Sequence, residues 1–289
     1  MKQLLILSGK GGTGKTTVAG ALIALSCSQA FADCDVDAPN LHLAVPEMSE
    51  PKSTDYYGFG KAVIDPAKCS RCGLCEENCR FGAIKNLSVE KFDCEGCAVC
   101  VEICPMQAIT MRDHLSGELR LYRTDQRVFS TAQLRIGSGA SGKLVTAVKK
   151  QLIQKARGAE LSIIDGSPGI GCPVIASISG ASIVLIVAEP TLSGLHDMKR
   201  IIATARNLAA LCAVCVNKFD VNIAITQEIE DYCQGLKIPV VGRIPFDKTV
   251  LEAVNHGQSI ACYPESPAGK AVISIWEDIY HNYLRGGAN

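Results

Sequence analysis

Two hydrophobic patterns alternate along most of the chain. Short apolar runs that suit buried strands occur at Gln3–Ser8, Ala159–Asp165, Ser182–Ala188, Cys212–Asn217 and Lys237–Val241. Helical periodicity appears between or after them, at Thr16–Ser28, Lys143–Ala156, Ser193–Leu208, Asn222–Gln234 and, as a final helix, Ala268–Leu284. Strands that alternate with helices predict an α/β fold, in which a parallel sheet is covered by helices on both faces.

The alternation breaks between about Gly60 and Met111, where cysteines are dense and an internal repeat appears. The repeated positions, which recur with a shift of 25 residues, are Cys69, Cys72, Cys75, Cys79 and then Cys94, Cys97, Cys100, Cys104. A duplicated unit of this size predicts a separate module. We therefore expect residues 1–60 and 113–289 to form the α/β domain and residues 61–112 to be inserted in it. The stretch Leu119–Arg135 is expected to be extended chain that leads back to the main sheet.

Composition narrows the class of protein. With 47% hydrophobic residues the chain can build a packed core, and its 29 basic and 29 acidic residues predict no strong attraction to nucleic acid or anionic membrane. Met1 and Lys2 lead directly into a strand, and the longest apolar run, Ala181–Ala188, is too short to span a bilayer. We expect a cytoplasmic protein with no membrane or nucleic-acid partner. In that setting, 15 cysteines indicate metal binding rather than disulfides.

A phosphate-binding motif follows the first predicted strand. Residues Gly9–Thr16 match the P-loop pattern, in which backbone N–H groups surround the phosphates at the start of a helix. Lys15 is expected to neutralise phosphate charge, and the Thr16 hydroxyl to bind Mg²⁺. The nucleotide-binding residues expected here are Gly11, Gly12, Thr13, Gly14, Lys15, Thr16 and Thr17. A second loop, Gly137–Lys143, fits most of the pattern, but Leu144 replaces the required Ser or Thr, so we expect no second nucleotide site.

Lys10 gives the motif a family resemblance. The run Lys10-Gly-Gly-Thr-Gly-Lys-Thr16 resembles the deviant P-loop of the Min/Par ATPases and the nitrogenase iron protein. This resemblance implies a three-layer, parallel-sheet P-loop fold and ATP as the nucleotide. It also implies a homodimer or related heterodimer that sandwiches ATP, in which Lys10 contacts the partner's phosphates.

Two acidic motifs resemble the switches of the same family. Asp33-Cys-Asp35-Val-Asp37 resembles the first switch, which implies that Asp35 positions the attacking water. Asp165 ends an apolar strand and is followed by Gly-Ser-Pro-Gly, which resembles the Walker B acid and second switch. Asp165 is therefore expected to hold Mg²⁺ or its water shell, and Gly169 to sense the γ-phosphate through its backbone.

The residues expected to bind the base are compatible with two nucleotides, ATP and GTP. Asn217-Lys-Phe-Asp220 spells a pattern that reads guanine in GTPases, whereas in the Min/Par family an asparagine at this place contacts adenine. Pro245-Phe-Asp247 resembles the loop that closes over the base, and the rest of the match favours ATP.

The cysteine repeat is typical of bacterial two-cluster ferredoxins, in which three cysteines of a run bind one [4Fe–4S] cluster and the fourth binds the other. By that rule the first cluster takes Cys69, Cys72, Cys75 and Cys104, and the second takes Cys94, Cys97, Cys100 and Cys79. The insert is thus expected to be an α+β ferredoxin-like module. Structural zinc is the rival interpretation, although zinc modules usually pair two Cys-x₂-Cys units across a longer spacer or use histidine.

Cys172 lies seven residues after Asp165. This spacing resembles the cluster-binding cysteine of the nitrogenase iron protein and raises the question of a third, dimer-bridging cluster. The second cysteine that such a cluster needs has no counterpart here.

Two functions follow from these motifs. One is ATP-gated electron transfer, in which nucleotide state controls a low-potential ferredoxin module or its partner contact; the other is an iron–sulfur cluster carrier or assembly scaffold. The insert lies between Asp35 and Asp165, so mechanical coupling of nucleotide and clusters is a hypothesis. The partner is expected to be an unidentified redox or cluster-acceptor protein. A third class of function, positioning on membrane or DNA, would need an anchor. The segment Gly269–Leu284 of the predicted final helix carries few cations, which disfavours binding to a membrane.

Overall fold

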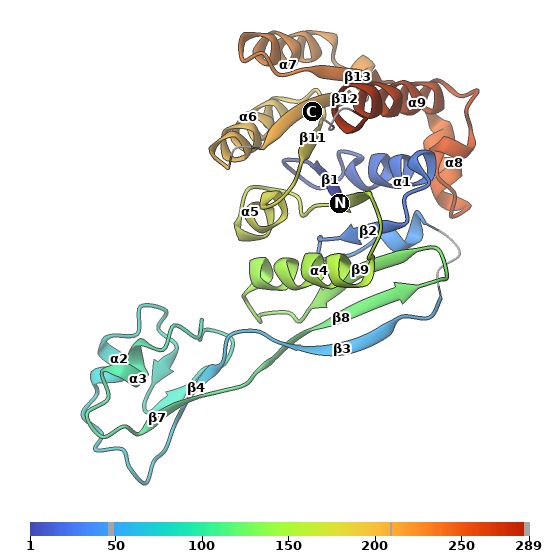
Figure 1. The fold of residues 1–289 in the computed structure, drawn as a ribbon. Coiled ribbons are helices and arrows are strands. Elements are labelled where there is room, and N and C mark those ends of the chain that lie inside the picture. The colour runs from blue at the N-terminus through green and yellow to red at the C-terminus, as the bar shows by residue number, and fades with distance from the viewer. Residues whose placement is uncertain (46–48, 209, 286–289) are drawn as a thin grey trace.

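The computed structural model describes residues 1–45, 49–208 and 210–285. Its largest element is a nine-stranded sheet with the order β13-β12-β11-β1-β10-β2-β9-β8-β3 (Figure 1). The strands are β1 (Lys2–Leu7), β2 (Ala30–Asp33), β3 (Lys52–Tyr57), β8 (Leu115–Arg123), β9 (Val128–Leu134), β10 (Leu161–Asp165), β11 (Ile183–Ala188), β12 (Leu211–Asn217) and β13 (Val240–Ile244). The run from β13 to β9 is parallel, and β8 and β3 add an antiparallel extension.

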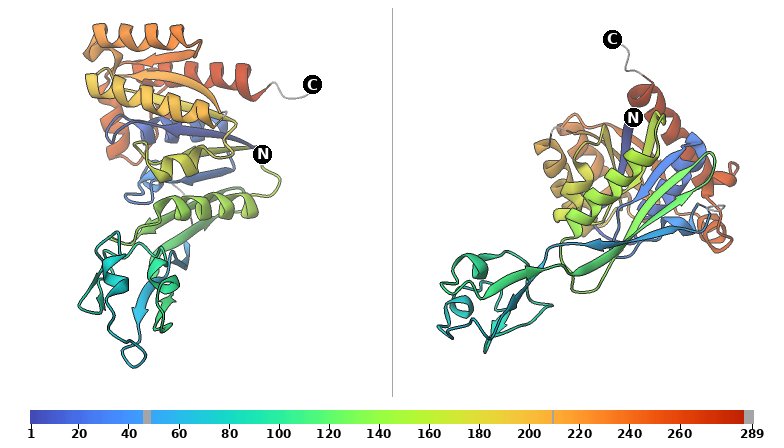
Figure 2. Two further views of the ribbon diagram at one scale, coloured as in Figure 1. Left: turned by 90° about the vertical axis from the view of Figure 1, so that its left-hand side faces the viewer. Right: turned by 60° about the horizontal axis from the view of Figure 1, so that its bottom comes forward.

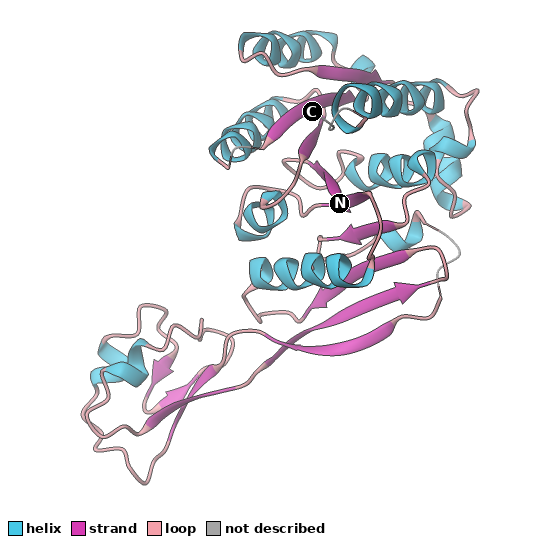
Figure 3. Cartoon of the chain, viewed as in Figure 1, coloured by secondary structure: helices cyan, strands magenta, loops and turns pink. Residues whose placement is uncertain are grey.

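Helices cover both faces of this sheet (Figure 3). One face carries α4 (Ser141–Lys155), α5 (Cys172–Ile178), α6 (Leu192–Asn207) and α7 (Ile223–Gly235). The other carries α1 (Lys15–Ser26), α8 (Lys248–Asn255) and α9 (Pro267–Ile279), with short turns at Leu41–Leu43 and Ile260–Cys262, whereas Phe219 of the turn Phe219–Val221 packs on the first face. Side chains of β1 alternate between the two cores, because successive strand residues point to opposite faces. The expected three-layer α/β architecture is confirmed.

The predicted elements differ from the structure at a few boundaries. The strand expected at Lys237–Val241 begins only at Val240, because Pro239 lacks an N–H and Lys237 has a positive φ of 56°. The final helix ends at Ile279 and continues as one wider π turn, Tyr280–Leu284. The extended stretch Leu119–Arg135 forms most of the β8–β9 hairpin, which turns where the Thr124 N–H donates to the Arg127 carbonyl.

A long antiparallel ribbon connects the sheet to the segment 61–112, here called the cysteine module. β3 pairs with β8, and beyond them β4 (Lys61–Ile64) pairs with β7 (Ile109–Arg112). Between β4 and β7 lie α2 (Leu74–Glu77), β5 (Ile84–Lys85), β6 (Ser88–Val89) and α3 (Val99–Glu102). The module projects from the β3/β8 end of the sheet, as the two views of Figure 2 show. Among the described residues, none of the helices combines the length and apolarity needed to cross a membrane.

The sequence repeat is also a repeat of backbone conformation. Helix α3 follows α2 at a shift of 25 residues, and the pairs of positive-φ residues keep the same shift: Arg71 and Gly96, Gly73 and Ala98, Gly82 and Gln107. The Asp65 N–H donates to the Ala108 carbonyl (2.7 Å), and the matching Glu90 N–H donates to the Ala83 carbonyl (2.8 Å). The module is therefore two similar halves packed on a small shared core, which contains buried Ala62, Ala83, Ile84 and Ile109.

Candidate functional site

The P-loop (residues 9–16) connects β1 to α1 at the carboxyl edge of the parallel strands. Gly12 and Gly14 adopt positive φ angles of 80° and 91°, which glycine reaches without strain. A Cβ on Gly14 would lie 2.3 Å from Asn217 Nδ2, so this position has no space for a side chain. The hollow beside the loop holds about 270 Å³, here called the nucleotide hollow, and is lined by Ser8, Lys10, Gly11, Gly12, Gly14, Lys15, Thr16, Thr17, Asp35, Asn40 and Pro168.

The two residues expected to bind Mg²⁺ are in contact, and Thr16 lines the nucleotide hollow. Asp165 is fully buried, forms an ion pair with buried Lys15 and accepts a hydrogen bond from the Thr16 hydroxyl at 2.6 Å. Thr16 Oγ1 also lies 3.1 Å from Asn40 Oδ1. Asn40 is absent from the sequence prediction; it follows the acidic motif by three residues and carries no recognisable pattern of its own.

Two aspartates of the acidic motif have different places: Asp33 is buried and binds backbone N–H groups, whereas Asp35 lines the nucleotide hollow. Asp33 is fully buried and accepts hydrogen bonds from the backbone N–H groups of Asp35, Asn40 and Leu41 at 2.8–2.9 Å. Burial, and secondarily the charge of Asp165, raise the pKa of Asp33 to about 7. Asp35 lines the nucleotide hollow, where burial raises its pKa and Lys15 opposes the shift.

The segment after Asp165 is tied to the strand before the P-loop. The Gly166 N–H donates to the Ile6 carbonyl (2.9 Å), and the Gly169 N–H donates to the Ser8 carbonyl (3.0 Å). Gly169 has a φ of 94°, which favours glycine at this turn. The predicted second switch therefore lies against the P-loop, with Pro168 in the wall of the nucleotide hollow.

Lys10 is held within its own chain by a polar group at the end of β11. Its ammonium lies 3.2 Å from Glu189 Oε2 and within 3.3 Å of the Thr191 and Ser193 hydroxyls. Glu189 also pairs with Lys218 at 3.0 Å. Burial would raise the pKa of Glu189, but hydrogen bonds from Lys218 and Lys10 outweigh it and leave the pKa below its usual value. Glu189 is absent from the sequence prediction, because its only signal is its position directly after a buried parallel strand.

The predicted base-contacting residues have different roles in the structure. Asn217 supports the P-loop, since its Nδ2 donates to the Thr13 carbonyl at 2.7 Å. Asp247 caps α8 through the Thr249 N–H (2.9 Å) and joins it to α9 through the Ala268 N–H (3.1 Å). Neither Pro245 nor Asp247 lines the nucleotide hollow, so their base contact stays a prediction.

The P-loop-like segment Gly137–Lys143 contacts the cysteine module. Lys143 Nζ donates to the Gly58 carbonyl at 3.2 Å and lies 4.7 Å from the centre of the Phe59 ring. A Cβ on Gly137 would lie 2.6 Å from Phe92, and one on Gly139 would lie 3.0 Å from Glu95 Oε2. This loop thus packs against the ribbon and one half of the module.

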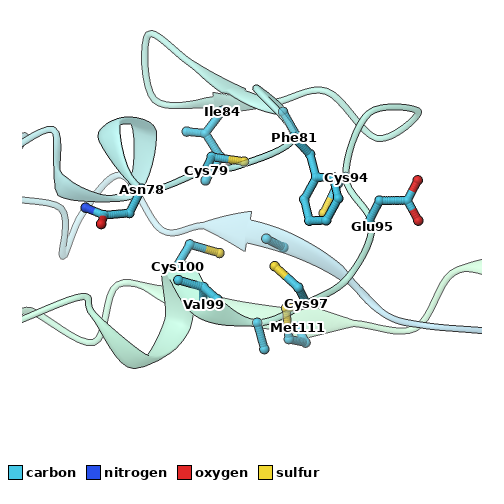
Figure 4. A pocket seen from close by; sticks show the side chains of 13 residues that line it. Asn78, Cys79, Phe81, Ile84, Cys94, Glu95, Cys97, Val99, Cys100 and Met111 are labelled. Atoms are coloured by element: carbon cyan, nitrogen blue, oxygen red, sulfur yellow. The ribbon is translucent and has the colours of Figure 1, made fainter.

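Eight cysteines of the module line two cavities. The first cysteine cavity contains Cys69, Cys72, Cys75 and Cys104, and the second contains Cys79, Cys94, Cys97 and Cys100. In Figure 4 the sulfur atoms of the second set turn toward one shared space. Each cavity thus combines three cysteines of one run with the fourth of the other run. Among the described residues, no group of three or more His, Cys, Asp or Glu side chains is arranged to hold a single metal ion.

Backbone groups also reach the cysteine sulfurs. The Arg71 N–H donates to Cys69 Sγ at 3.4 Å, and the Ala108 N–H donates to Cys104 Sγ at 3.3 Å. The remaining members of the first cavity wall are mainly apolar, including Ile64, Leu74, Leu87 and Ile109. Cys172 lies outside both cavities, exposed at the first residue of α5.

Comparisons with known proteins identify the family of the nucleotide-binding fold. Residues 4–260 match the family model of the CobQ/CobB/MinD/ParA nucleotide binding domain. An uncharacterised protein of Methanocaldococcus jannaschii is 29% identical over 96% of both chains, and an iron–sulfur cluster carrier protein of Pyrococcus horikoshii is 24% identical over 96% of this chain and 85% of the relative. The Mg–ADP complex of the septum site-determining protein MinD from Pyrococcus horikoshii superposes with a TM-score of 0.59 at 18% identity, covering 99% and 97% of the two chains. The chain therefore belongs to the CobQ/CobB/MinD/ParA nucleotide-binding family and is a P-loop ATPase of the MinD/ParA type.

Proposed function

We propose that this ATPase carries two [4Fe–4S] clusters in its cysteine module and couples its nucleotide state to electron transfer through them. The observation that carries the proposal is the membership of the two cavities. Each gathers four thiols in the crossed three-plus-one arrangement expected for a two-cluster ferredoxin. When bound, such clusters accept and donate single electrons.

The cavities fit an iron–sulfur cluster in their chemistry. Four thiolates suit iron–sulfur clusters, and N–H groups directed at Cys69 and Cys104 sulfur are the contacts that stabilise negative charge on a ligand. One cysteine of each set, Cys72 and Cys97, remains exposed at the surface. Residues 69, 72, 75 and 104 would hold one cluster, and residues 79, 94, 97 and 100 the other.

At the nucleotide, the side chains have separable tasks. Thr16 and Asp165 would hold Mg²⁺ or its water shell, and Lys15 would neutralise the phosphates. Asp35 lines the nucleotide hollow and would orient the attacking water. ATP is the proposed nucleotide, with GTP as the alternative that the Asn217 motif leaves open.

A continuous set of contacts supports coupling between the two sites. The segment 133–143, here called the coupling segment, touches the predicted first switch and the start of α5, three residues after the predicted second switch: the Leu134 N–H donates to the Val36 carbonyl (2.8 Å), and Gly142 packs against the Cys172 backbone. Its other end contacts Phe92 and Glu95, beside the Cys94–Cys97 loop. A movement of either switch would therefore be felt at the second cysteine cavity.

A second function, delivery of clusters to an acceptor protein, is favoured by one finding. The relative from Pyrococcus horikoshii is an iron–sulfur cluster carrier protein, and the alignment spans 96% of this chain. Against this stands the full set of four thiols in each cavity, because a cluster held by four ligands of one chain is not readily released.

The test begins with protein purified without oxygen. The proposal expects about eight irons and eight sulfides per chain, as follows from two four-iron clusters, together with Mg²⁺-dependent ATP hydrolysis. Cluster potentials are then measured with and without a non-hydrolysable ATP analogue, and the reconstituted protein is mixed with an apo-ferredoxin. A nucleotide-dependent potential without cluster movement supports electron transfer, whereas loss of iron to the acceptor supports the carrier function. Zinc or no metal in the preparation overturns both.

A further inference from the structure

Lys61 is a buried cation beside the second cysteine cavity. It lies on β4, only 4% of it is exposed, and its ammonium donates to the backbone carbonyl of Cys94. Among the residues that the structure describes, no carboxylate lies close enough to form an ion pair with it. Burying an ammonium without an anion is costly, so this position needs a negative group nearby. The thiolates of the second cavity are the negative groups that the module offers.

The two halves of the module differ at this point. The 25-residue shift relates Lys61 to Asn86, which is exposed and whose N–H donates to the Glu76 carboxylate at 3.1 Å. The position that matches Glu76 in the other half is Val101. The buried ammonium therefore lies beside the second cavity, through Cys94, and its repeat-related position is an exposed amide, while the carboxylate of Glu76 has an apolar counterpart in Val101.

Exposed charges of both signs lie beside each set of cysteines. Lys68, Arg71 and Glu76 flank cysteines of the first cavity, and Arg80, Asp93 and Glu95 flank those of the second. All of them are exposed, so water and salt screen them. The ammonium of Lys61 is surrounded by protein, so its field is screened far less than theirs.

We propose that Lys61 raises the reduction potential of the cluster in the second cysteine cavity above that of the cluster in the first. This inference rests on the proposed function. A nearby positive charge stabilises the reduced, more negative state of a cluster. A single electron on the module then resides in the second cavity, beside the Cys94–Cys97 loop that the coupling segment contacts.

The experiment is a redox titration of the full-length, anaerobically purified protein, followed by EPR. Lys61→Met removes the charge, Lys61→Arg retains it, and Lys85→Met removes an exposed charge from the same module as a control. The wild type is expected to show two potentials. In Lys61→Met the higher potential is expected to fall by at least about 59 mV, which for one electron is a tenfold change in the equilibrium constant for reduction. The lower potential stays unchanged. Lys61→Arg restores the difference, and Lys85→Met changes neither potential.

Other outcomes overturn the inference. An unchanged or raised upper potential in Lys61→Met, or an equal shift of both, removes the assigned role. Should Lys61→Met fail to fold, the half-reduced wild type decides: NMR signals of the Cys94 and Cys97 β-protons are expected to change before those of Cys69 and Cys72, and the reverse order contradicts us. Iron and sulfide analysis separates this from failure of the proposed function, since protein without iron refutes both.

Discussion

Lys15 and Asp165 form an ion pair that is almost completely removed from solvent, at the point where the P-loop meets the end of β10. Asp165 also accepts the Thr16 hydrogen bond, so one carboxylate organises both functional side chains at the end of the P-loop. Removing one partner of a buried pair leaves the other charge uncompensated, which costs far more than losing a surface ion pair.

We therefore expect Asp165→Asn to abolish most ATP hydrolysis. The substitution keeps the shape of the side chain but removes the charge that pairs with Lys15 and that is proposed to hold Mg²⁺. Phosphate release should fall by about 10²-fold or more, the range seen when one electrostatic contact to a transition state is removed. Asp125→Asn, at the exposed tip of the β8–β9 hairpin, is the matched control and should hydrolyse ATP normally. Wild-type turnover in Asp165→Asn would contradict the assignment.

Asp33 is expected to make stability depend on pH in an unusual direction. Its pKa is raised from 3.8 to about 7 by burial and by Asp165, so the folded protein favours the protonated form. The contribution of Asp33 to the free energy of unfolding is complete below about pH 4 and declines as the pH rises toward 7. Chemical unfolding of wild type and Asp33→Asn between pH 5 and 8 measures this. The wild type should lose stability relative to the variant up to about pH 7, and a relative gain would refute the protonated state.

Lys10 offers a test of the expected dimer. If Lys10 acts on the partner's phosphates, Lys10→Ala should bind nucleotide normally but lose roughly 10³-fold in turnover, as for an arginine finger. Lys150→Ala, on the exposed side of α4, controls for loss of a positive charge.

Mixing variants distinguishes action in the same chain from action across a dimer. Asp35→Asn retains Lys10, and Lys10→Ala retains Asp35, so a mixed dimer rebuilds one complete site only when Lys10 acts on the partner. Recovery of phosphate release upon mixing is the expected result. Two inactive proteins that stay inactive together would assign Lys10 to its own nucleotide.

The contact between Gly14 and Asn217 predicts a coupled pair of substitutions. Gly14→Ala adds a Cβ that would lie 2.3 Å from Asn217 Nδ2, and it imposes a positive φ of 91° on alanine. The backbone strain alone costs about 1–2 kcal/mol, and the clash adds to it. Asn217→Ala relieves the clash but not the strain, so the double variant should be less destabilised than the sum of the singles. Strict additivity in chemical unfolding would show that the two residues do not touch.

Lys143 allows coupling to be separated from catalysis. Lys143→Met removes the bond to the Gly58 carbonyl and the contact with Phe59 but leaves the nucleotide hollow intact. ATP turnover should stay unchanged, while the nucleotide-dependent shift in cluster potential becomes smaller. Lys150→Met provides the matched control. A full shift in Lys143→Met would mean that the coupling segment does not transmit the nucleotide state through this contact.

Much of the fold follows from local sequence. The buried parallel strands are continuous apolar runs, and P-loop chemistry needs Lys15 and Thr16 at fixed spacing, so both are visible without a structure. The four-residue β2 and the short helices α5 and α8 were missed because they are too brief for a periodic signal.

The site is only partly visible because some roles depend on tertiary contacts. Asp33, Asp35 and Asp37 look alike in sequence. Only the fold shows that Asp33 is buried and that Asp35 lines the nucleotide hollow. Glu189 contacts Lys10 although the two residues are 179 positions apart in the chain. A local sequence pattern cannot predict such a contact. Lys61 gives no signal at all, since its burial depends on the Cys94 loop folding back over β4.

The paired ribbon that connects the cysteine module to the sheet has an evolutionary consequence. The chain leaves on β3 and returns on β8, with Tyr57 opposite Leu115, so entry and exit are neighbours. Joining these two strands by a tight turn would leave the order of the nine-stranded sheet unchanged. A module attached in this way can be gained, lost or exchanged by a single genetic event, and the ATPase domain does not need to be rebuilt.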